Sequence, residues 1–426
     1  MNLIALVRTF YKGLDRIFKI INYGDVPFIY NNPVYMEKYA FARCSLIGYW
    51  KSVVELGREM LRPTLKIYSI PSGPLIFCGG SSNNEREFHF FSSLFAGRQS
   101  LGYSRESNLS FVPARQLKKT IVEYFISLLF IALGCFYLFR IKLGPISFKY
   151  LVFYTKIYFF LYASLMRSKE KPRLLIVAND HTDFPVIASM LMQYFDVPVV
   201  YVQHAEISER FPALDFNVSI LRNEISREKY QAIGPIQGDV FVVPRAPKSD
   251  MFERILRAKA VVTPVVVYIS SIYSESGLAR CLSQLASNAS VTSVSVKPHP
   301  RTDISSLNVG PNVALLSSVP TFDHVAVVPN SSIVVELLEQ GVPVYQLFEL
   351  DDIGHDYYSF VEKGVTPAIS FDDLTGKFWG SGGFYNEAWV ERFSRFSPSI
   401  DSAWEAELPV LLDKIGLYLS VSGDHC

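Results

Sequence analysis

The chain has 426 residues, and it is poor in charge and in cysteine for that length. Asp, Glu, Lys and Arg make up 19% of it and the formal net charge is +1, so no overall positive field is present to attract nucleic acid. An odd number of scattered cysteines without a C-x-x-C pair excludes a disulfide scaffold and fits a reducing compartment. The five are Cys44, Cys78, Cys135, Cys281 and Cys426.

Several motifs are also missing. The sequence contains no H-E-x-x-H, G-x-S-x-G or P-loop pattern, and Gly79-Gly80 lacks the spacing of a dinucleotide-binding loop. Asp351-Asp352 is the nearest approach to an acidic metal-binding pair, and we expect neither a metal nor a cofactor. The first residues carry charges every few positions and lack a small-residue cleavage site. They predict an amphipathic helix rather than a signal peptide.

Apolar and aromatic residues are abundant instead, and the longest apolar run lies between residues 120 and 166. TIVEYFISLLFIALGCFYLF contains one charge, Glu123, and YLVFYTKIYFFLYASLM follows it. The first segment is long enough to span a bilayer. A hairpin would however export Arg140, Lys142 and Lys149 against the positive-inside tendency. We therefore expect either helices lying in the membrane interface or a buried pair of core helices, rather than true spans.

The length predicts two domains, each able to bury its own core. From Arg173 onward, buried-type strands alternate with amphipathic helices, which predicts parallel sheets with helices on both faces. The segment PRAPK at 244–248 is typical of a linker. We expect one α/β domain over residues 1–247, with the apolar helices at about 120–166 inserted in it, and a second over residues 248–426.

The most informative stretch runs from Val291 to Gln346. It opens with a strand that ends in KPHPR, where two prolines hold His299 at the carboxyl end of the strand. A later strand ends in PNSS, and an apolar-periodic helix follows. Asn330 or Ser331 is the expected N-cap of that helix, where free N–H groups and hydroxyls suit an anion. A histidine, basic residues and a serine pair together predict a phosphate-binding site.

Polar residues also follow the strands of the first domain. Asp180 and His181 come directly after one buried-type strand, and His204 and Glu206 follow the next. Ligands of parallel α/β sheets bind beyond the carboxyl ends of the strands. These side chains are therefore candidates for the acceptor side of a site between the two domains.

Two such domains facing each other across a cleft are the plan of GT-B glycosyltransferases. The chain resembles bacterial members of that class that use CMP-activated acidic sugars, the sialyl-, polysialyl- and Kdo transferases of capsule or lipopolysaccharide biosynthesis. The resemblance rests on His299-Pro300, matching their HP motif, and on Ser331-Ser332, matching their serine motif. YVQHAEISERFPALDF is also similar to a segment of proteins from capsule and lipopolysaccharide gene clusters. The similarity covers roughly the last 250 residues.

The resemblance implies a metal-independent inverting transfer and assigns roles on the donor side. His299 would contact the donor phosphate and protonate it as it leaves, while Ser331 and Ser332 would bind its other oxygens. Further donor-side candidates are Glu336 as a ribose ligand, Lys297 and Arg301 as positive charges, and, more weakly, Ser270, Ser271 and His355-Asp356.

An inverting transfer also needs a general base that takes the proton of the acceptor hydroxyl. The D/E-D/E-G triplet of the related sialyltransferases is missing from the expected place. Asp180 is the first choice for the base, Glu206 the second and Asp183 the third. His204 would orient the acceptor or support the base, and His181 lies on the same acceptor side.

These features predict an inverting glycosyltransferase that moves a sialic acid or Kdo-type sugar from CMP to a glycan or lipid-linked glycan. Its expected place is the cytoplasmic face of the cell membrane, with peripheral membrane contact and no nucleic-acid partner. The alternatives are a CDP-glycerol or CDP-ribitol phosphotransferase of the teichoic-acid type, and a UDP-sugar transferase or epimerase. A non-catalytic GT-B-like assembly protein is the alternative from outside the enzymes.

Overall fold

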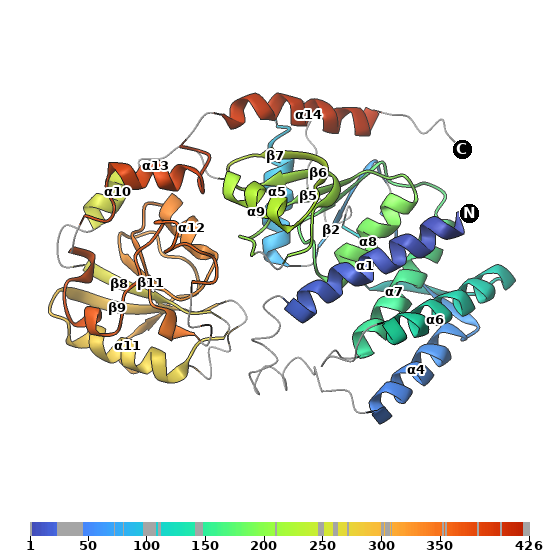
Figure 1. Cartoon of the computed structure of the whole chain (residues 1–426), viewed down its shortest axis with the longest axis horizontal. Helices are drawn as coiled ribbons and strands as arrows, with labels where there is room; N and C mark the ends of the chain where they lie inside the picture. Colours follow the sequence, from blue (N-terminus) through green and yellow to red (C-terminus); the bar gives the residue numbers. More distant parts are fainter. Residues whose placement is uncertain are drawn as a thin grey trace.

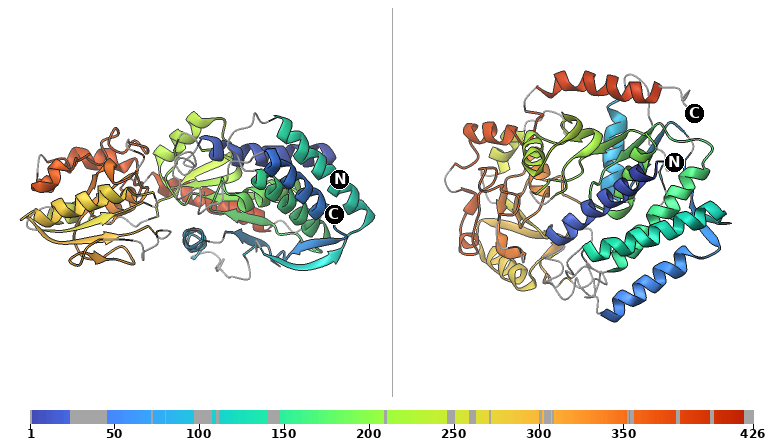
Figure 2. Two further views of the ribbon diagram at one scale, coloured as in Figure 1. Left: turned by 90° about the horizontal axis from the view of Figure 1, so that it is seen from below. Right: turned by 45° about the vertical axis from the view of Figure 1, so that its right-hand side comes forward.

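The protein forms two α/β domains that lie next to each other along its long axis (Figures 1 and 2). The computed structural model describes residues 2–23, 46–71, 73–79, 81–96, 108–109, 112–140, 148–208, 211–245, 251–258, 263–270, 272–299, 302, 307, 309–351, 353, 356–380, 383–400 and 403–420. Most of the predicted linker at 244–248 lies outside these ranges. The placement of the domain boundary therefore stays a prediction.

The first domain is built on a five-stranded sheet in which all neighbouring strands are parallel. Its strands follow one another across the sheet in sequence order, β2-β4-β5-β6-β7. They are β2 (Leu75–Cys78), β4 (Leu174–Val177), β5 (Val199–Val202), β6 (Asp215–Leu221) and β7 (Gln237–Val242). The apolar runs LLIV of β4 and VVYV of β5 are buried along their whole length. Such continuous burial requires cover on both faces of the sheet.

Side chains that alternate along β4 show this cover directly. Leu175 and Val177 belong to one apolar cluster, whereas Leu174 and Ile176 belong to another on the opposite face. The first cluster holds α1 (Leu3–Tyr23), α4 (Leu46–Met60), α6 (Ile121–Arg140), α7 (Phe148–Arg167) and α8 (Asp183–Tyr194). The second holds α5 (Ser82–Ser93) and α14 (Trp404–Ser420), and α9 (Glu224–Ile233) connects β6 to β7.

Helix α14 comes from the far end of the sequence but packs on the first domain (Figure 1). Its buried Leu411, Leu412 and Ile415 join the aromatic side chains of α5, and Arg227 of α9 bonds Glu407 at 2.8 Å. The chain therefore crosses from the second domain back to the first before it ends.

The predicted apolar helices at 120–166 are present as α6 and α7, and they differ in burial. Helix α7 is buried almost throughout, while α6 leaves one side exposed. A two-stranded antiparallel ribbon of β1 (Thr64–Tyr68) and β3 (Pro113–Lys118) lies against α7 and leads into α6. Within the described residues, none of the helices has the length and hydropathy needed to cross a bilayer.

The second domain is also built on a five-stranded parallel sheet, but its strand order is β10-β9-β8-β11-β12. The order reverses at β8, and parallel sheets bind their ligands at such a reversal. Its strands are β8 (Thr263–Tyr268), β9 (Val291–Lys297), β10 (Ala314–Leu315), β11 (Val325–Val328) and β12 (Val344–Gln346). Its helices are α10 (Met251–Ala258), α11 (Glu275–Ser287), α12 (Ile333–Glu339) and α13 (Glu387–Ser394), with 3-10 turns at Phe348–Leu350, Asp372–Thr375 and Phe378–Gly380.

The predicted fold class of two Rossmann-like domains is confirmed. The expected start of α12 is wrong by one or two residues, since Ser332 rather than Asn330 or Ser331 is the N-cap. Asn330 is buried, and its side-chain oxygen accepts the backbone N–H of Tyr357 at 2.9 Å. That bond fixes the loop after β12 against the end of β11, so the asparagine shapes the site instead of starting the helix.

Candidate active site

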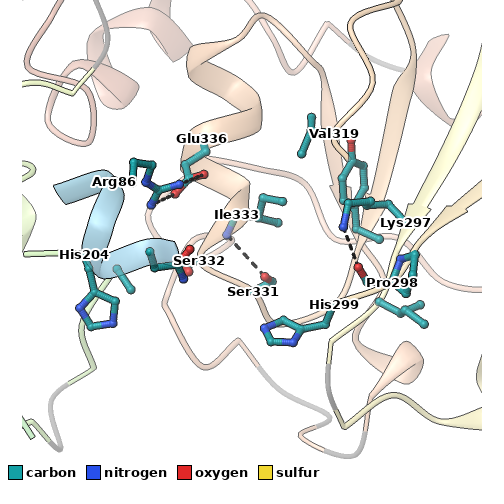
Figure 3. A pocket seen from close by; sticks show the side chains of 14 residues that line it. Arg86, His204, Lys297, Pro298, His299, Val319, Ser331, Ser332, Ile333 and Glu336 are labelled. Atoms are coloured by element: carbon teal, nitrogen blue, oxygen red, sulfur yellow. Dashed lines mark hydrogen bonds and ion pairs between the residues drawn. The ribbon is translucent and has the colours of Figure 1, made fainter. Parts of the chain in front are cut away.

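A cavity of about 250 Å³ lies where the two domains meet, at the reversal point of the second sheet (Figure 3). The second domain supplies residues that follow β8, β9 and β11, and the first supplies residues of α5 and of the loop after β5. The lining residues are Asn83, Arg86, His204, Ala205, Tyr268, Ile269, Lys297, Pro298, His299, Val319, Ser331, Ser332, Ile333 and Glu336.

The second-domain wall carries the groups that a phosphate requires. Lys297 ends β9, and its ammonium group donates to the carbonyl of Pro298 at 2.7 Å, with His299 next in the chain. Partial burial lowers the pKa of Lys297 below its usual value. Ser331 Oγ accepts the backbone N–H of Ile333 at 3.4 Å, whereas the Ser332 hydroxyl makes no capping bond. Cations, hydroxyls and a helix start therefore line one cavity.

The structure brings five of the predicted donor-side residues together in this cavity: Lys297, His299, Ser331, Ser332 and Glu336. Ser270 does not line it, because its hydroxyl accepts the backbone N–H of Ile272 in a turn. The predictions for Ser271, Arg301 and His355 fall outside the described residues. Two further residues named from the sequence hold loops in place. Asp351 accepts the backbone N–H of Asn330, and Asp356 accepts three backbone N–H groups.

Glu336 lines the cavity, but first-domain arginines hold its carboxylate. Arg86 of α5 lies 3.2 Å from it and Arg222, just after β6, lies 3.1 Å from it. Burial alone would raise the pKa of Glu336, yet these two guanidinium groups keep it below its usual value. A ribose that binds Glu336 must therefore compete with an ion pair that joins the two domains.

Asp180 cannot act as the base that contacts the acceptor, because its side chain has no exposed surface. It accepts bonds from the Tyr230 hydroxyl at 2.9 Å and the His181 ring at 2.8 Å. Burial raises the pKa of Asp180, but His181 and Arg16 outweigh it and leave the value lowered. An ionised Asp180 makes His181 Nδ1 the donor, so Nε2 of that partly exposed ring is free to accept a proton. This geometry makes His181, rather than Asp180, the candidate for the base.

The other two carboxylates proposed as the base, like His181, do not line the cavity itself. Glu206 is 2% exposed, its Oε1 accepts the side-chain amide of Asn223 at 2.9 Å, and burial raises its pKa. Asp183 is the first residue of α8, with Thr182 as the N-cap, and burial raises its pKa to about 7. Glu206 therefore shapes the loop after β5, while Asp183 lies at the start of a helix on the covered face of the sheet.

His204 lies between His181 and the cavity. Its ring lines the cavity wall, and the ring centroids of His204 and His181 are 6.3 Å apart. Burial first, and then the nearby His181, lower the pKa of His204 to about 4, so the ring is neutral at physiological pH. Nδ1 of His204 is buried without a hydrogen-bond partner. The ring therefore contributes a neutral part of the cavity wall, and its Nδ1 is not exposed to a ligand.

Two residues of the site were missed by the sequence reasoning. Arg222 follows β6 at the carboxyl end of the strand, and the same position after β5 identified His204, so the sequence also carried a signal for Arg222. Arg86 lies within an amphipathic helix, where nothing in the pattern separates it from a solvent-exposed charge. No cluster of three or more His, Cys, Asp or Glu side chains suited to a metal ion occurs in the parts of the chain described above.

Neither a protein-family model nor a curated protein matches the sequence. Among solved structures, the chain is similar to CalG4, the calicheamicin glycosyltransferase, at 14% identity over 64% of this chain and 80% of that one, with a TM-score of 0.39. It is similar to a putative UDP-N-acetylglucosamine 2-epimerase from Listeria monocytogenes at 11% identity, over 82% and 97%, with a TM-score of 0.44. HepE from Anabaena, in complex with UDP and glucose, matches at 13% identity over 82% and 99%, with a TM-score of 0.37. The two-domain assignment rests on the sheets of this chain, independently of these similarities.

Proposed function

We propose that the protein is a GT-B glycosyltransferase that transfers a sugar from a nucleotide donor to a hydroxyl acceptor. The observation that carries the proposal is the cavity at the reversal of the second sheet. It gathers Lys297 and His299 from the end of β9 and Ser331 from the end of β11, and it faces His204 of the other domain. Lys297, His299 and the serine pair, here called the phosphate seat, would hold the phosphate on one side of the cavity. The other side would leave room for a sugar.

On the donor side, the phosphate of the nucleotide would lie against Lys297, His299 and the serine pair. As the bond between the anomeric carbon and the phosphate oxygen breaks, negative charge develops on that oxygen. Hydrogen bonds and positive charges that are already in place stabilise this charge more than they stabilise the ground state. His299 would donate to the departing oxygen, and Lys297 would balance its charge.

On the acceptor side, His181 would accept the proton of the attacking hydroxyl at Nε2, while Asp180 holds the ring and stabilises its charged form. The acceptor oxygen then bonds to the anomeric carbon from the face opposite the phosphate, which inverts the configuration. The proton ends on His181 and the electron pair of the broken bond ends on the nucleotide. Proton transfer of this kind contributes about 10²- to 10⁴-fold to the rate.

Two donor classes fit the charge of the cavity. A CMP-activated acidic sugar carries one phosphate and one carboxylate, and a UDP-sugar carries two phosphates. Each therefore brings two negative charges to Lys297, His299 and the serine hydroxyls. The sequence motifs resemble those of CMP-dependent enzymes, whereas HepE binds UDP. The two donor classes are distinguished by the nucleotide that binds. The proposed acceptor is a glycan or lipid-linked glycan at the inner membrane face.

The donor is identified by measuring the shift in thermal unfolding with UDP, CMP and CDP, because a bound nucleotide raises the apparent stability by mass action. One nucleotide is expected to raise the unfolding temperature of the wild type more than the other two. The shift should disappear in His299→Ala and persist in His89→Ala, which changes an exposed histidine outside the cavity. If none of the three nucleotides shifts the unfolding temperature, or if the shift persists in His299→Ala, the proposed phosphate seat is contradicted.

Product analysis separates the remaining alternatives. A glycosyltransferase releases the nucleotide and leaves no phosphate in the product, whereas a CDP-glycerol phosphotransferase leaves one phosphate per transferred group. If His299→Ala leaves glycan production unchanged in cells, the cavity is not catalytic and an assembly role is the better interpretation.

A further inference from the structure

Exposed apolar side chains are concentrated on helix α6. Of the sixteen large apolar side chains that are exposed among the described residues, five belong to this helix. Their exposed fractions lie between 51% and 76%. Single exposed apolar residues need no explanation, but a group of this size on one element marks an interaction surface. The five are Ile121, Val122, Phe125, Leu128 and Phe136.

Four of the five share one side of the helix. Residues 121, 125, 128 and 136 follow the spacing of a helical face, and Ala132 of the same row is also exposed. The opposite side of α6 is buried, and Phe130 packs there against Phe159 and Tyr162 of α7 with ring centroids 5.9 and 6.4 Å apart. The helix is therefore anchored to the domain through α7 and presents a fixed apolar row outward.

Charged side chains of both signs are exposed on the elements beside α6, and those that directly precede it in the sequence are basic. Arg115 and Lys118 are exposed on β3, just before α6 begins. The acidic residue of the helix, Glu123, is largely buried and bound by Arg167 at 2.6 Å. Helix α4, which packs beside α6, adds the exposed Trp50.

We propose that the outward row of α6, with the basic residues that precede it, docks the protein on an anionic phospholipid bilayer. An amphipathic helix that lies in the plane of the membrane buries its apolar side among the acyl chains. Its basic neighbours meet the negative headgroups. A second copy of the chain is the alternative occupant of this row, and the light-scattering measurement below distinguishes it from a bilayer.

The inference does not depend on the proposed chemistry, but it fits a lipid-linked acceptor. Helix α6 belongs to the first domain, which also carries His181 and His204. Docking through this domain would leave the second domain, with its phosphate seat, free to take a donor from solution. The two parts of the interpretation are tested by different measurements, so one can fail without the other.

Co-sedimentation of the full chain with vesicles tests the docking. The wild type should bind vesicles of phosphatidylglycerol and phosphatidylcholine more tightly than vesicles of phosphatidylcholine alone. The double variant Phe125→Ser/Leu128→Ser should lose about tenfold or more in affinity, since two apolar contacts with the bilayer are removed. The matched control is Val410→Ser/Leu417→Ser on α14, where Val410 is 59% and Leu417 is 64% exposed. This variant should bind like the wild type.

The charge contribution is tested by Arg115→Glu/Lys118→Glu, which should remove the preference for anionic vesicles. The thermal unfolding transition of each variant, recorded without nucleotide, reports whether it is folded. The proposal is overturned if the wild type binds no vesicles or if the α6 variant binds as well as the wild type. It is also overturned if the wild type is a dimer in light scattering that Phe125→Ser/Leu128→Ser converts to a monomer, since a second copy then covers the row.

Discussion

The two domains present very different strand ends to the shared cavity. On the second domain, Lys297 and Ser331 line the cavity and each bonds a backbone group close to it in the sequence, while the Ser332 hydroxyl makes no capping bond. On the first domain, the polar groups after β4, β5 and β6 bond mainly one another. Asp180 bonds His181 and Tyr230, and Gln203 accepts the backbone N–H of Arg222 while donating to Ser226.

The difference distinguishes polar groups that are placed to bind a ligand from polar groups that fix the conformation of the loops around the cavity. A phosphate seat needs donors that are exposed to the cavity, and the second domain supplies them. A general base needs one accessible nitrogen with a defined tautomer, and a buried network supplies that by fixing everything behind it. In the first domain, many buried polar residues therefore position two histidines, His181 and His204.

The sharpest test of this division removes the accessible base. His181→Ala should lower kcat by about 10³-fold, because proton transfer from the acceptor is lost. The nucleotide-induced thermal shift should not change, since the ring does not line the donor cavity. Steady-state kinetics with a saturating donor measure the effect. A loss of less than tenfold would place the base elsewhere.

Asp180→Asn separates positioning from direct catalysis. The amide keeps the size of the side chain but removes the negative charge that selects the His181 tautomer and stabilises its protonated form. We expect a smaller loss in kcat than in His181→Ala and a shift in the acid limb of the pH–rate profile. A purely structural role for Asp180 would lower the unfolding temperature and leave the pH profile of the remaining activity unmoved.

The phosphate seat comes next in expected effect. His299→Ala should lower the rate about 10²-fold, which is typical when one donor to a developing oxyanion is removed. His89→Ala serves as the control, because that histidine is exposed on α5 and lies outside the cavity. Equal losses in both variants would indicate a general effect on stability rather than a lost contact with phosphate.

The sequence predicted the second domain's part of the site better than the first domain's. Lys297, His299 and the serine pair each follow a strand directly, and parallel strands bring their carboxyl ends to one edge. Their convergence therefore follows from the order of strands alone. The choice between Asp180 and His181 depends on which adjacent side chain is buried, and strand periodicity stops being informative once the strand has ended.

The sequence also predicted both apolar helices but not their different roles. Helix α7 is buried against α1, α4 and α6, whereas α6 has one exposed side, although α6 has the more hydrophobic sequence. Burial here depends on which helix lies outermost in the layer, a property of the packed domain. Arg86 was missed for the same reason, since its partner Glu336 is contributed by the other domain.

Glu336 tests whether the contact between the domains competes with the donor. If its carboxylate binds ribose, Glu336→Gln should raise the KM for the donor about tenfold with little change in kcat, as expected for one charged hydrogen bond. Arg86→Ala should act in the opposite direction, because it frees the carboxylate from one competitor. Donor titrations of both variants measure this contrast. If the two variants shift KM in the same direction, Glu336 is a link between domains and not a ribose ligand.

The smallest expected effects concern the pH dependence of stability, and two groups of the first domain, His204 and Asp183, illustrate them. The pKa of His204 is about 4 in the folded chain, because burial and His181 disfavour its charged form. The unfolded chain holds the proton more strongly between about pH 4 and its ordinary value near 6.5. Stability should therefore fall as the pH drops through this window. Urea denaturation of the wild type and His204→Gln at pH 7.5 and 5 should show a smaller fall in the variant.

Asp183 contributes with the opposite sign in the same range. Burial raises its pKa from 3.8 to about 7, so the folded chain holds the proton more strongly than the unfolded one. This group therefore adds stability as the pH falls from about 7 toward 4, and Asp183→Asn should remove that gain. Because the two groups oppose each other, the wild type alone is uninformative and the two variants must be compared with it separately. A Lys297→Ala variant, altered in the phosphate seat, should follow the wild type across this pH range, since it leaves both His204 and Asp183 unchanged.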